Sequence, residues 1–452
     1  MTPRRVIDVQ NFITEHTDRK LSPLQIWTVV LCFLIVGIDG FDTGAIGFIA
    51  PALRTEWQVT AGQIAPLFGA GLFGLVAGSF IFGPLADRIG RKYSLLLTVL
   101  FFGLASLASA WAADILQLTI LRFLTGVGLG GAMPNAITLT SEYCPDSRRS
   151  FLTTAMYCGF ILGSALGGLA AAQFIDTYGW RSILLFGGIV PLAMLPFLWF
   201  WLPESARFLV LKRAPAEEVA AILHKIAPEA DLKDAEFSGV KPAEGSPVRQ
   251  LFAPSELRGT ILLWATYFMS LMVYYLLASW LPTVINSAGM SLKEASYFAM
   301  MLQVGGSVGA IVIGLMMDRT EPHYVLGAFY IGAAVFIAMI GIATGSAVLL
   351  ALAVFGAGLC LAGSQIGLHA LAAGFYPTAN RATGVAWANG IGRMGSVLGS
   401  MIGGVLLNSG LSLATVFVVI GAPVFISSIC MYIKSKVAPQ PVHGKVVLDP
   451  AH

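Results

Sequence analysis

The 452-residue chain is strongly apolar, with 56% hydrophobic and only 11% charged residues. An ordinary soluble domain has roughly 25% charged residues, so this composition excludes a soluble globular protein and indicates an integral membrane protein. The net charge of +3 is too small to indicate a nucleic-acid partner, and we expect none.

Twelve apolar runs are long enough to cross a bilayer, which takes about 20 helical residues. We expect transmembrane helices over residues 24–49, 62–86, 93–112, 115–141, 151–175, 180–202, 259–283, 295–317, 324–342, 347–374, 383–407 and 411–433. The sequence therefore predicts an all-α membrane protein that is embedded in a lipid bilayer.

The orientation of these runs follows from their loops. Most basic residues lie in the terminal segments and the even-numbered loops, whereas the odd-numbered loops hold only Arg54, Arg181 and Lys293. Because basic residues stay on the cytoplasmic side, we expect both termini in the cytoplasm. The predicted organisation is a cytoplasmic arm (1–23), a six-helix bundle (24–202), a cytoplasmic linker (203–258), a second six-helix bundle (259–433) and a cytoplasmic tail (434–452).

The two halves of the sequence repeat each other. Three residues of GPLADRIGRK recur in GLMMDRTEPH, where Gly83, Asp87 and Arg88 correspond to Gly314, Asp318 and Arg319. The segment CPDSRR likewise recurs as YPTANR, so that Arg149 corresponds to Arg381. Matching loops on one side imply two pseudo-symmetric bundles with the same orientation. In such a fold we expect a substrate site near the membrane midplane and alternating access to it.

Four charged residues lie at membrane depth, away from the ends of the apolar runs. Asp39 and Asp42 are three residues apart in the first run, which places them on one helical face. Each costs about 2.5–3.5 kcal/mol at the bilayer centre, so a functional role is the default hypothesis. Arg122 and Arg393 balance them in formal charge. An arriving carboxylate would unbalance this set, and one proton would restore neutrality, which predicts proton-coupled transport of an organic anion.

Several segments resemble a known family. GPLADRIGRK resembles the signature of the major facilitator superfamily. Four more segments resemble the aromatic acid:proton symporters within that superfamily: DGFDT, LRFLTGVGLGGAMPNA, LPESARFLV and FYPTANRATGVAWANGIGRMGS. Within this group, the chain is similar to the bacterial 4-hydroxybenzoate/protocatechuate permeases. The resemblance implies a major facilitator fold and import of a hydroxybenzoate-like carboxylate across the inner membrane by proton symport. It also implies a functional monomer without a cofactor, the proton being the coupling ion.

Roles in coupling and binding can be assigned to the membrane-depth polar residues. Asp39 and Asp42 are candidates for the proton site, because burial and a nearby like charge favour the protonated carboxyl group. Arg393 is the candidate for the substrate carboxylate, since its planar guanidinium matches a carboxylate; pairing with an aspartate is the alternative. Arg122 is equally suited to either role. The remaining substrate-binding candidates are Asn135, Gln365 and His369 for a ring hydroxyl, and Trp387 and Tyr267 for the ring, with simple packing as the alternative for each.

The repeated loops predict a gate. We interpret Gly83 as a position where helices approach closely, and Asp87 as an acceptor for amides at the start of a neighbouring helix. Arg88 and Arg91 hold the loop inside, and Glu142 either joins this network or is a solvated helix end. The C-terminal copy, with Asp318, Arg319 and Arg381, is degraded and predicts a weaker second gate. The alternative is that these loops are topological anchors only.

Other classes of function fit less well. An enzyme would need a nucleophile–base pair or a metal cluster, and the spacing of the membrane-depth residues and of the five cysteines predicts neither. A receptor would need a larger polar domain than residues 203–258. A transporter of a sugar or another organic anion is the main alternative, since LPESARFLV is also sugar-porter-like. The charged residues suit an anion better than a polyol, and a multidrug exporter would favour a larger apolar cavity.

Overall fold

The computed structural model describes residues 6–17, 20–232, 235–238, 251–252, 254–376 and 381–437. Within these residues twelve helical segments are long and apolar enough to span a membrane. They are α2 (Pro23–Trp57), α3 (Ala61–Ile89), α4 (Arg91–Ser109), α5 (Ile115–Tyr143), α6 (Arg149–Tyr178), α7 (Arg181–Trp201), α11 (Pro254–Ser287), α12 (Leu292–Met317), α13 (Pro322–Ile342), α14 (Ala347–Ala357) continued by α15 (Gly363–Phe375), α16 (Arg381–Leu407) and α17 (Leu413–Val437). The prediction of twelve spans is confirmed.

The helices group into two compact units. The first contains Met1–Ala45, Ala70–Gly167 and Tyr178–Pro242, and the second contains Ile46–Gly69, Gly168–Thr177 and Ala243–His452. The second unit thus includes one end each of α2, α3 and α6. Packing inside this unit explains the grouping, because the Phe68 and Trp280 ring centroids are 5.0 Å apart and Gln173 Nε2 donates to the Tyr297 hydroxyl at 2.6 Å.

Close helix packing repeats between the halves. A Cβ atom on Gly163 of α6 would overlap the carbonyl oxygen of Gly37 on α2. In the same way, a Cβ atom on Gly395 of α16 would overlap the carbonyl oxygen of Phe268 on α11. Small residues let transmembrane backbones approach closely. The resulting packing contacts hold the helices together, because apolar side chains gain little by leaving lipid. The first and fifth helices of each half therefore pair in the same manner, as the predicted pseudo-symmetry requires.

The fourth helix of each half shows a difference. Gly126 and Gly130 of α5 lie against α3, at the usual one-turn spacing. In the second half Gly358 and Gly363 lie against α12, and between them α14 and α15 are joined by a π-helical segment, Gly358–Ala362. A π segment accommodates one extra residue in a helix, and such segments occur frequently at functional sites.

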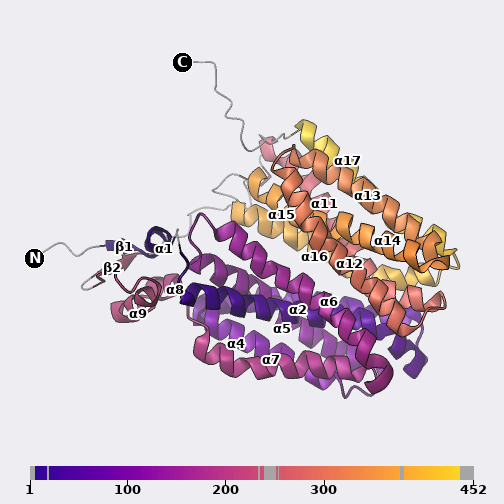
Figure 1. Ribbon diagram of the computed structural model, residues 1–452, viewed down its shortest axis with the longest axis horizontal. Helices are drawn as coiled ribbons and strands as arrows, with labels where there is room; N and C mark the ends of the chain where they lie inside the picture. Colours follow the sequence, from indigo (N-terminus) through magenta and orange to yellow (C-terminus); the bar gives the residue numbers. More distant parts are fainter. Residues whose placement is uncertain are drawn as a thin grey trace, which may run out of the picture. The chain divides into compact units, whose positions relative to one another are not determined.

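The arm and the linker, which were predicted only as polar segments, contain short helices and strands. Five short elements lie together in the first unit (Figure 1): β1 (Val6–Asp8), α1 (Val9–Thr17), α8 (Ala206–Leu211), α9 (Ala216–Ile226) and β2 (Glu236–Ser238). β1 pairs with β2 in parallel, with Val6 opposite Glu236. Phe12 and Ile13 of α1 are buried in the same hydrophobic core as Leu223 of α9. Apolar residues at helical spacing thus fold the arm onto the linker.

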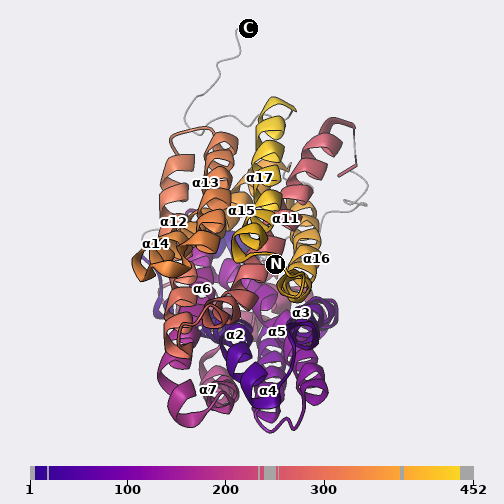
Figure 2. The same ribbon diagram turned by 90° about the vertical axis from the view of Figure 1, so that its right-hand side faces the viewer.

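Several predicted helix ends differ from the structure; the first span, for example, continues to Trp57 instead of ending at residue 49. α11 begins at Pro254 rather than at residue 259, and α17 continues to Val437 beyond residue 433. Lys434 is fully buried, with Nζ 3.7 Å from the centroid of the Phe375 ring and 3.3 Å from His323 Nε2. Lys434 is therefore a packing residue of the last helix and not part of a polar tail. Figure 2 shows α13 and α17, which this contact joins, side by side.

Candidate functional site

Asp42 of α2 and Arg122 of α5 form a buried ion pair. Arg122 Nη2 lies 2.5 Å from Asp42 Oδ2, while Nη1 donates to Oδ1 at 3.3 Å and Nη2 donates to the Asp42 carbonyl at 3.1 Å. Ser106 of α4 adds a hydrogen bond to Oδ1 at 2.7 Å. The side chains of Arg122 and Asp42 are only 4% and 1% exposed. Of the two interpretations of Arg122, the structure favours pairing with an aspartate.

Asp39 lies one turn before Asp42 on α2 and is also buried. Thr43 Oγ1 donates to Asp39 Oδ1 at 3.2 Å, which is a bond within the same helix. The Asp39 carboxyl group thus has the Thr43 hydroxyl among its partners, whereas Asp42 accepts from the Arg122 guanidinium and the Ser106 hydroxyl. The two aspartates differ in these contacts although they lie one turn apart on the same helix.

The C-terminal unit gathers polar side chains from α11 and α15. The Tyr267 hydroxyl lies 2.9 Å from His369 Nδ1, and the two rings meet edge to face with centroids 5.4 Å apart. Ser270 Oγ donates to Gln365 Oε1 at 2.8 Å. Tyr267 and Ser270 are three residues apart on α11, and Gln365 and His369 are four apart on α15, so each pair shares a helical face. The structure thus brings Tyr267, Gln365 and His369 together between α11 and α15.

Arg393 of α16 joins this polar group. Its Nη1 donates at 3.2 Å to the hydroxyl of Tyr275, which lies about two turns after Tyr267 on α11. Gly392 places α16 directly against Tyr267, because a Cβ atom there would lie 3.4 Å from the Tyr267 side chain. A cation, a phenol, an imidazole and an amide are therefore assembled by α11, α15 and α16 within one unit. We call Tyr267, Ser270, Gln365, His369 and Arg393 the polar cluster.

Two further candidates for substrate binding contact residues outside the polar cluster. Trp387 is 44% exposed and stacks on Trp264, with centroids 6.0 Å apart and an interplanar angle of 16°. Asn135 is buried between α4 and α5, where it donates to Ser94 Oγ at 3.1 Å and to the Gly131 carbonyl at 2.8 Å. The Asn135 amide is thus engaged in helix packing, which was the alternative to substrate binding.

At the end of α3 the predicted gating residues form a network around Glu204. Glu204 Oε1 accepts hydrogen bonds from the backbone amides of Arg91 at 2.8 Å and Lys92 at 3.3 Å, which open α4. Asp87 instead forms an ion pair with Arg91 at 3.0 Å. The predicted acceptor role of Asp87 is therefore wrong: within the described residues, the carboxylate that accepts from the first amides of α4 belongs to Glu204.

The other gating candidates have varied surroundings. Glu142 accepts a hydrogen bond from Ser205 Oγ, which ties the end of α5 to the start of α8. Arg88, Asp318 and Arg319 are exposed. The side chain of Arg381 lies outside the described residues.

The close-approach interpretation of Gly83 is wrong for this structure. No described atom lies within 4 Å of the position that a Cβ on Gly83 would occupy, and the same is true of Gly314. A glycine is needed instead at Gly90, which has a φ of 99° and lies against the Glu204 carboxylate. A positive φ strains residues with a Cβ atom. This local geometry lets Glu204 reach the amides that begin α4.

The chain was compared with known proteins. A family model described as Major Facilitator Superfamily matches residues 32–357 and 263–449. The chain belongs to the Major Facilitator Superfamily. It is 46% identical to the 4-hydroxybenzoate transporter of Pseudomonas aeruginosa over 96% of both chains, and 44% identical to a gallate transporter of Pseudomonas putida over 94% of both. Among solved structures, a D-xylose-proton symporter superposes with a TM-score of 0.72 at 19% identity, covering 93% of this chain and 99% of the other.

Membership of this superfamily agrees with the prediction that the chain is not an enzyme, because these relatives are named transporters. The membrane-spanning helices and this membership together define a multi-pass membrane protein. The similarity to the sugar symporter concerns the fold alone.

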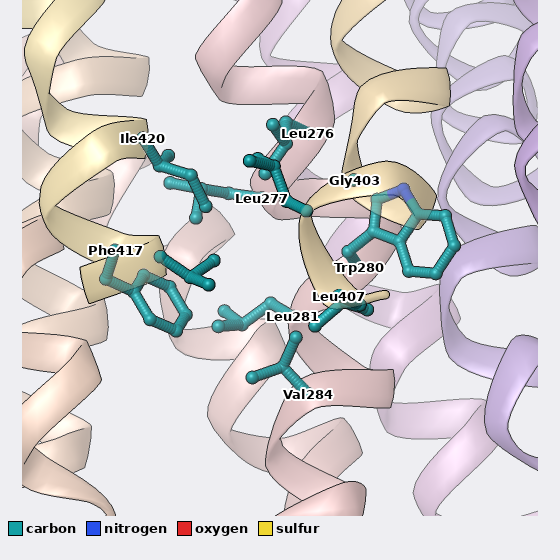
Figure 3. A pocket seen from close by; sticks show the side chains of 11 residues that line it. Leu276, Leu277, Trp280, Leu281, Val284, Gly403, Leu407, Phe417 and Ile420 are labelled. Atoms are coloured by element: carbon teal, nitrogen blue, oxygen red, sulfur yellow. The ribbon is translucent and has the colours of Figure 1, made fainter. Parts of the chain in front are cut away.

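An apolar pocket lies apart from the polar cluster in the same unit. Figure 3 shows side chains from α11, α16 and α17 around it, including Leu277, Trp280 and Phe417. The indole Nε1 of Trp280 donates to the Ser400 carbonyl at 2.7 Å, so its polar atom is already engaged. A carboxylate site needs a few convergent polar groups, and this pocket has an apolar lining.

Sequence reasoning missed several residues of this superfamily member. Glu204 lies in LPESARFLV, which was noted for its resemblance but received no role. Ser106, Ser270 and Tyr275 are ordinary residues in apolar runs, and nothing in the sequence distinguishes them from packing residues. Their roles arise from tertiary contacts with Asp42, Gln365 and Arg393.

Proposed function

We propose that this chain imports a hydroxylated aromatic carboxylate across the bacterial inner membrane by proton symport with alternating access. The termini lie in the cytoplasm, the transporter acts as a monomer, and the proton is the coupling ion without any cofactor. The observation that carries the proposal is the polar cluster, in which Arg393 is assembled with a phenol, an imidazole and an amide. The names of the similar transporters, for 4-hydroxybenzoate and gallate, support the substrate class.

Arg393 is the proposed partner of the substrate carboxylate. Its guanidinium is held by Tyr275, and charge-assisted, two-pronged bonds to a carboxylate are roughly twice as strong as neutral ones. Tyr267 and His369 offer ring faces and edges beside it. Aromatic pairs prefer such edge-to-face or offset contacts, which favours a planar aromatic substrate over an aliphatic one.

Asp39 is the proposed proton site. Because Asp42 and Arg122 form a direct ion pair, we assign the coupling proton to Asp39 and the substrate anion to Arg393. A buried carboxylate is costly in the membrane, so binding a proton there offsets the charge of an arriving anion. The two aspartates then have separate roles: Asp42 pairs with Arg122, and Asp39 carries the proton.

Uptake into cells or proteoliposomes tests the proposal. We expect accumulation of radiolabelled 4-hydroxybenzoate that a protonophore abolishes, whereas counterflow exchange persists because exchange needs no net proton movement. A panel of benzoates and D-xylose distinguishes the substrate classes. Accumulation that survives the protonophore and follows a sodium gradient would overturn the proton coupling, and accumulation of D-xylose but not of benzoates would overturn the substrate class.

A further inference from the structure

One amide in the polar cluster has an unused hydrogen-bonding atom. Ser270 Oγ donates to Gln365 Oε1 at 2.8 Å, which fixes the amide plane. Gln365 Nε2 is buried and has no hydrogen-bond partner among the described residues. The residue as a whole is only partly buried.

An unused buried amide atom is informative because it is costly. Leaving such a group without a partner disfavours a structure, and native proteins contain few of them. At a transmembrane helix this holds with particular force, since lipid supplies no partner. A ligand that hydrogen-bonds to the second amide atom of Gln365 would remove the cost.

The orientation of the amide identifies the kind of ligand group. The oxygen and nitrogen of an amide can exchange places in a structure. The contact therefore shows that Ser270 binds one of the two amide atoms and that the other atom has no partner, whichever of the two it is. A serine hydroxyl can serve either orientation, since it donates and accepts. The ligand group must match whichever atom remains, and a hydroxyl matches both, whereas a carboxylate matches only the nitrogen.

We infer that Gln365 recognises a ring hydroxyl of the substrate, and that it thereby sets the preference for phenolic over unsubstituted aromatic acids. This rests on the proposed function, in which Arg393 binds the carboxylate of the same molecule. His369 lies one turn along the same face of α15, about 5–6 Å away between Cβ atoms, so the same hydroxyl can reach its imidazole. Ser270 is a positioning residue that acts through Gln365.

The test compares ligands that differ only in the hydroxyl. Binding of 4-hydroxybenzoate and 4-methylbenzoate, and of 3-hydroxybenzoate and 3-methylbenzoate, is measured by calorimetry on the purified full-length protein and on Gln365→Met. Methionine keeps the length of the side chain and removes both polar amide atoms. We expect the hydroxyl-to-methyl affinity ratio to fall by about 3- to 10-fold for at least one pair, which is the worth of one neutral hydrogen bond. Affinity for the methyl compounds should stay within about twofold.

A matched pair of serine variants controls for packing. Ser270→Ala should lower the same ratio, because the amide loses its anchor, although by less than Gln365→Met. Ser364→Ala removes an equally buried hydroxyl, which donates to the Cys360 carbonyl one turn earlier, and should leave the ratio unchanged.

The outcomes separate the inference from the proposed function. If Gln365→Met leaves both ratios unchanged, or weakens hydroxyl and methyl ligands equally, the inference is wrong while the proposed function stands. If the unmodified protein, correctly folded by its thermal unfolding transition, binds none of the four acids, the proposed function itself is wrong. Should Ser364→Ala lower the ratio as much as Ser270→Ala, the effect would come from helix packing and the inference would be overturned.

Discussion

At the scale of single residues, the two membrane-depth aspartates have different contacts, and we propose separate roles for them. Asp42 faces a buried guanidinium and a hydroxyl, and Asp39 accepts from Thr43 in its own helix. Removing one partner of a buried ion pair leaves the other charge uncompensated, which costs about 3–5 kcal/mol. We therefore propose that the Asp42–Arg122 pair contributes mainly to stability and that Asp39 carries the coupling proton.

Matched asparagine variants test this separation. Asp42→Asn should lower the midpoint of thermal unfolding in detergent, because Arg122 stays charged and buried, and combining it with Arg122→Gln should restore part of the loss. Asp39→Asn should unfold near the parent midpoint but lose uphill uptake while retaining counterflow exchange. Equal loss of stability in both single variants would show that the two carboxyl groups share one role.

The two arginines can be separated in the same way. Arg393→Lys keeps the charge but loses the planar fork, and should weaken binding of 4-hydroxybenzoate by about 1–3 kcal/mol, as measured by calorimetry. The variant should also lose discrimination between the acid and its amide. Arg122→Lys should leave affinity nearly unchanged and shift the pH dependence of uptake. Unchanged affinity in Arg393→Lys with a large loss in Arg122→Lys would reverse the assignment.

The sequence was informative about these residues only up to a point. A charge inside an apolar run is visible without a structure, because its cost in the bilayer is known, and Asp39, Asp42, Arg122 and Arg393 were found on that basis. Which charge pairs with which was not visible, since Asp42 and Arg122 meet through the packing of α2 on α5. Uncharged partners such as Ser106 carry no sequence signal at all.

At the scale of elements, α4 depends on a carboxylate from a distant segment. Gly90 provides no side-chain cap, and Glu204 Oε1 instead accepts from the first two backbone amides of the helix and from the Ser205 amide at 2.8 Å. Amides at a helix start have no partner within the helix, and an acidic acceptor there also meets the positive end of the helix dipole. Glu204 thus fixes the segment after α7 to the start of α4.

Replacing Glu204 tests this capping role. Glu204→Ala should destabilise the protein by about 1–2 kcal/mol, the usual worth of a helix cap, and Glu204→Gln by less because an acceptor remains. The measurement is the thermal unfolding midpoint in detergent. Glu217→Ala, at an exposed position of α9, is the control and should change stability little. If Glu204→Ala unfolds at the parent midpoint, the three amides must have found other acceptors.

Element positions were easier to predict than element ends. Runs of about 20 apolar residues identified all twelve spans, because a helix that crosses the hydrocarbon core needs an apolar run of that length. The ends at Pro254 and Val437 were missed because helices continue into the interface wherever tertiary contacts cover their polar residues, as Phe375 and His323 do for Lys434. The short elements of the arm were missed for the same reason, since their apolar residues are buried only against the linker.

At the scale of the whole molecule, the charge asymmetry of the loops predicts its sidedness. Thr177 at the end of α6 and Glu217 on α9 are both exposed, so a cysteine at either position can react. In a variant without the five native cysteines, a membrane-impermeant maleimide should label Thr177→Cys on intact cells and Glu217→Cys only after permeabilisation. Labelling in the reverse order would show that the predicted orientation is inverted, and that the distribution of basic residues does not indicate the cytoplasmic side here.

The π-helical segment Gly358–Ala362 has a consequence for how the two halves diverged. Glycines that contact the neighbouring helix are one α-turn apart in α5 but have an additional residue between them in the tenth span. Each residue advances an α-helix by about 100°, so a single insertion changes the phase of everything downstream. The π segment absorbs the extra residue instead, because Gly363 still contacts α12 beyond it. The tenth span therefore keeps glycines against α12 on both sides of the insertion, while Gln365 and His369 in the following turns contact α11.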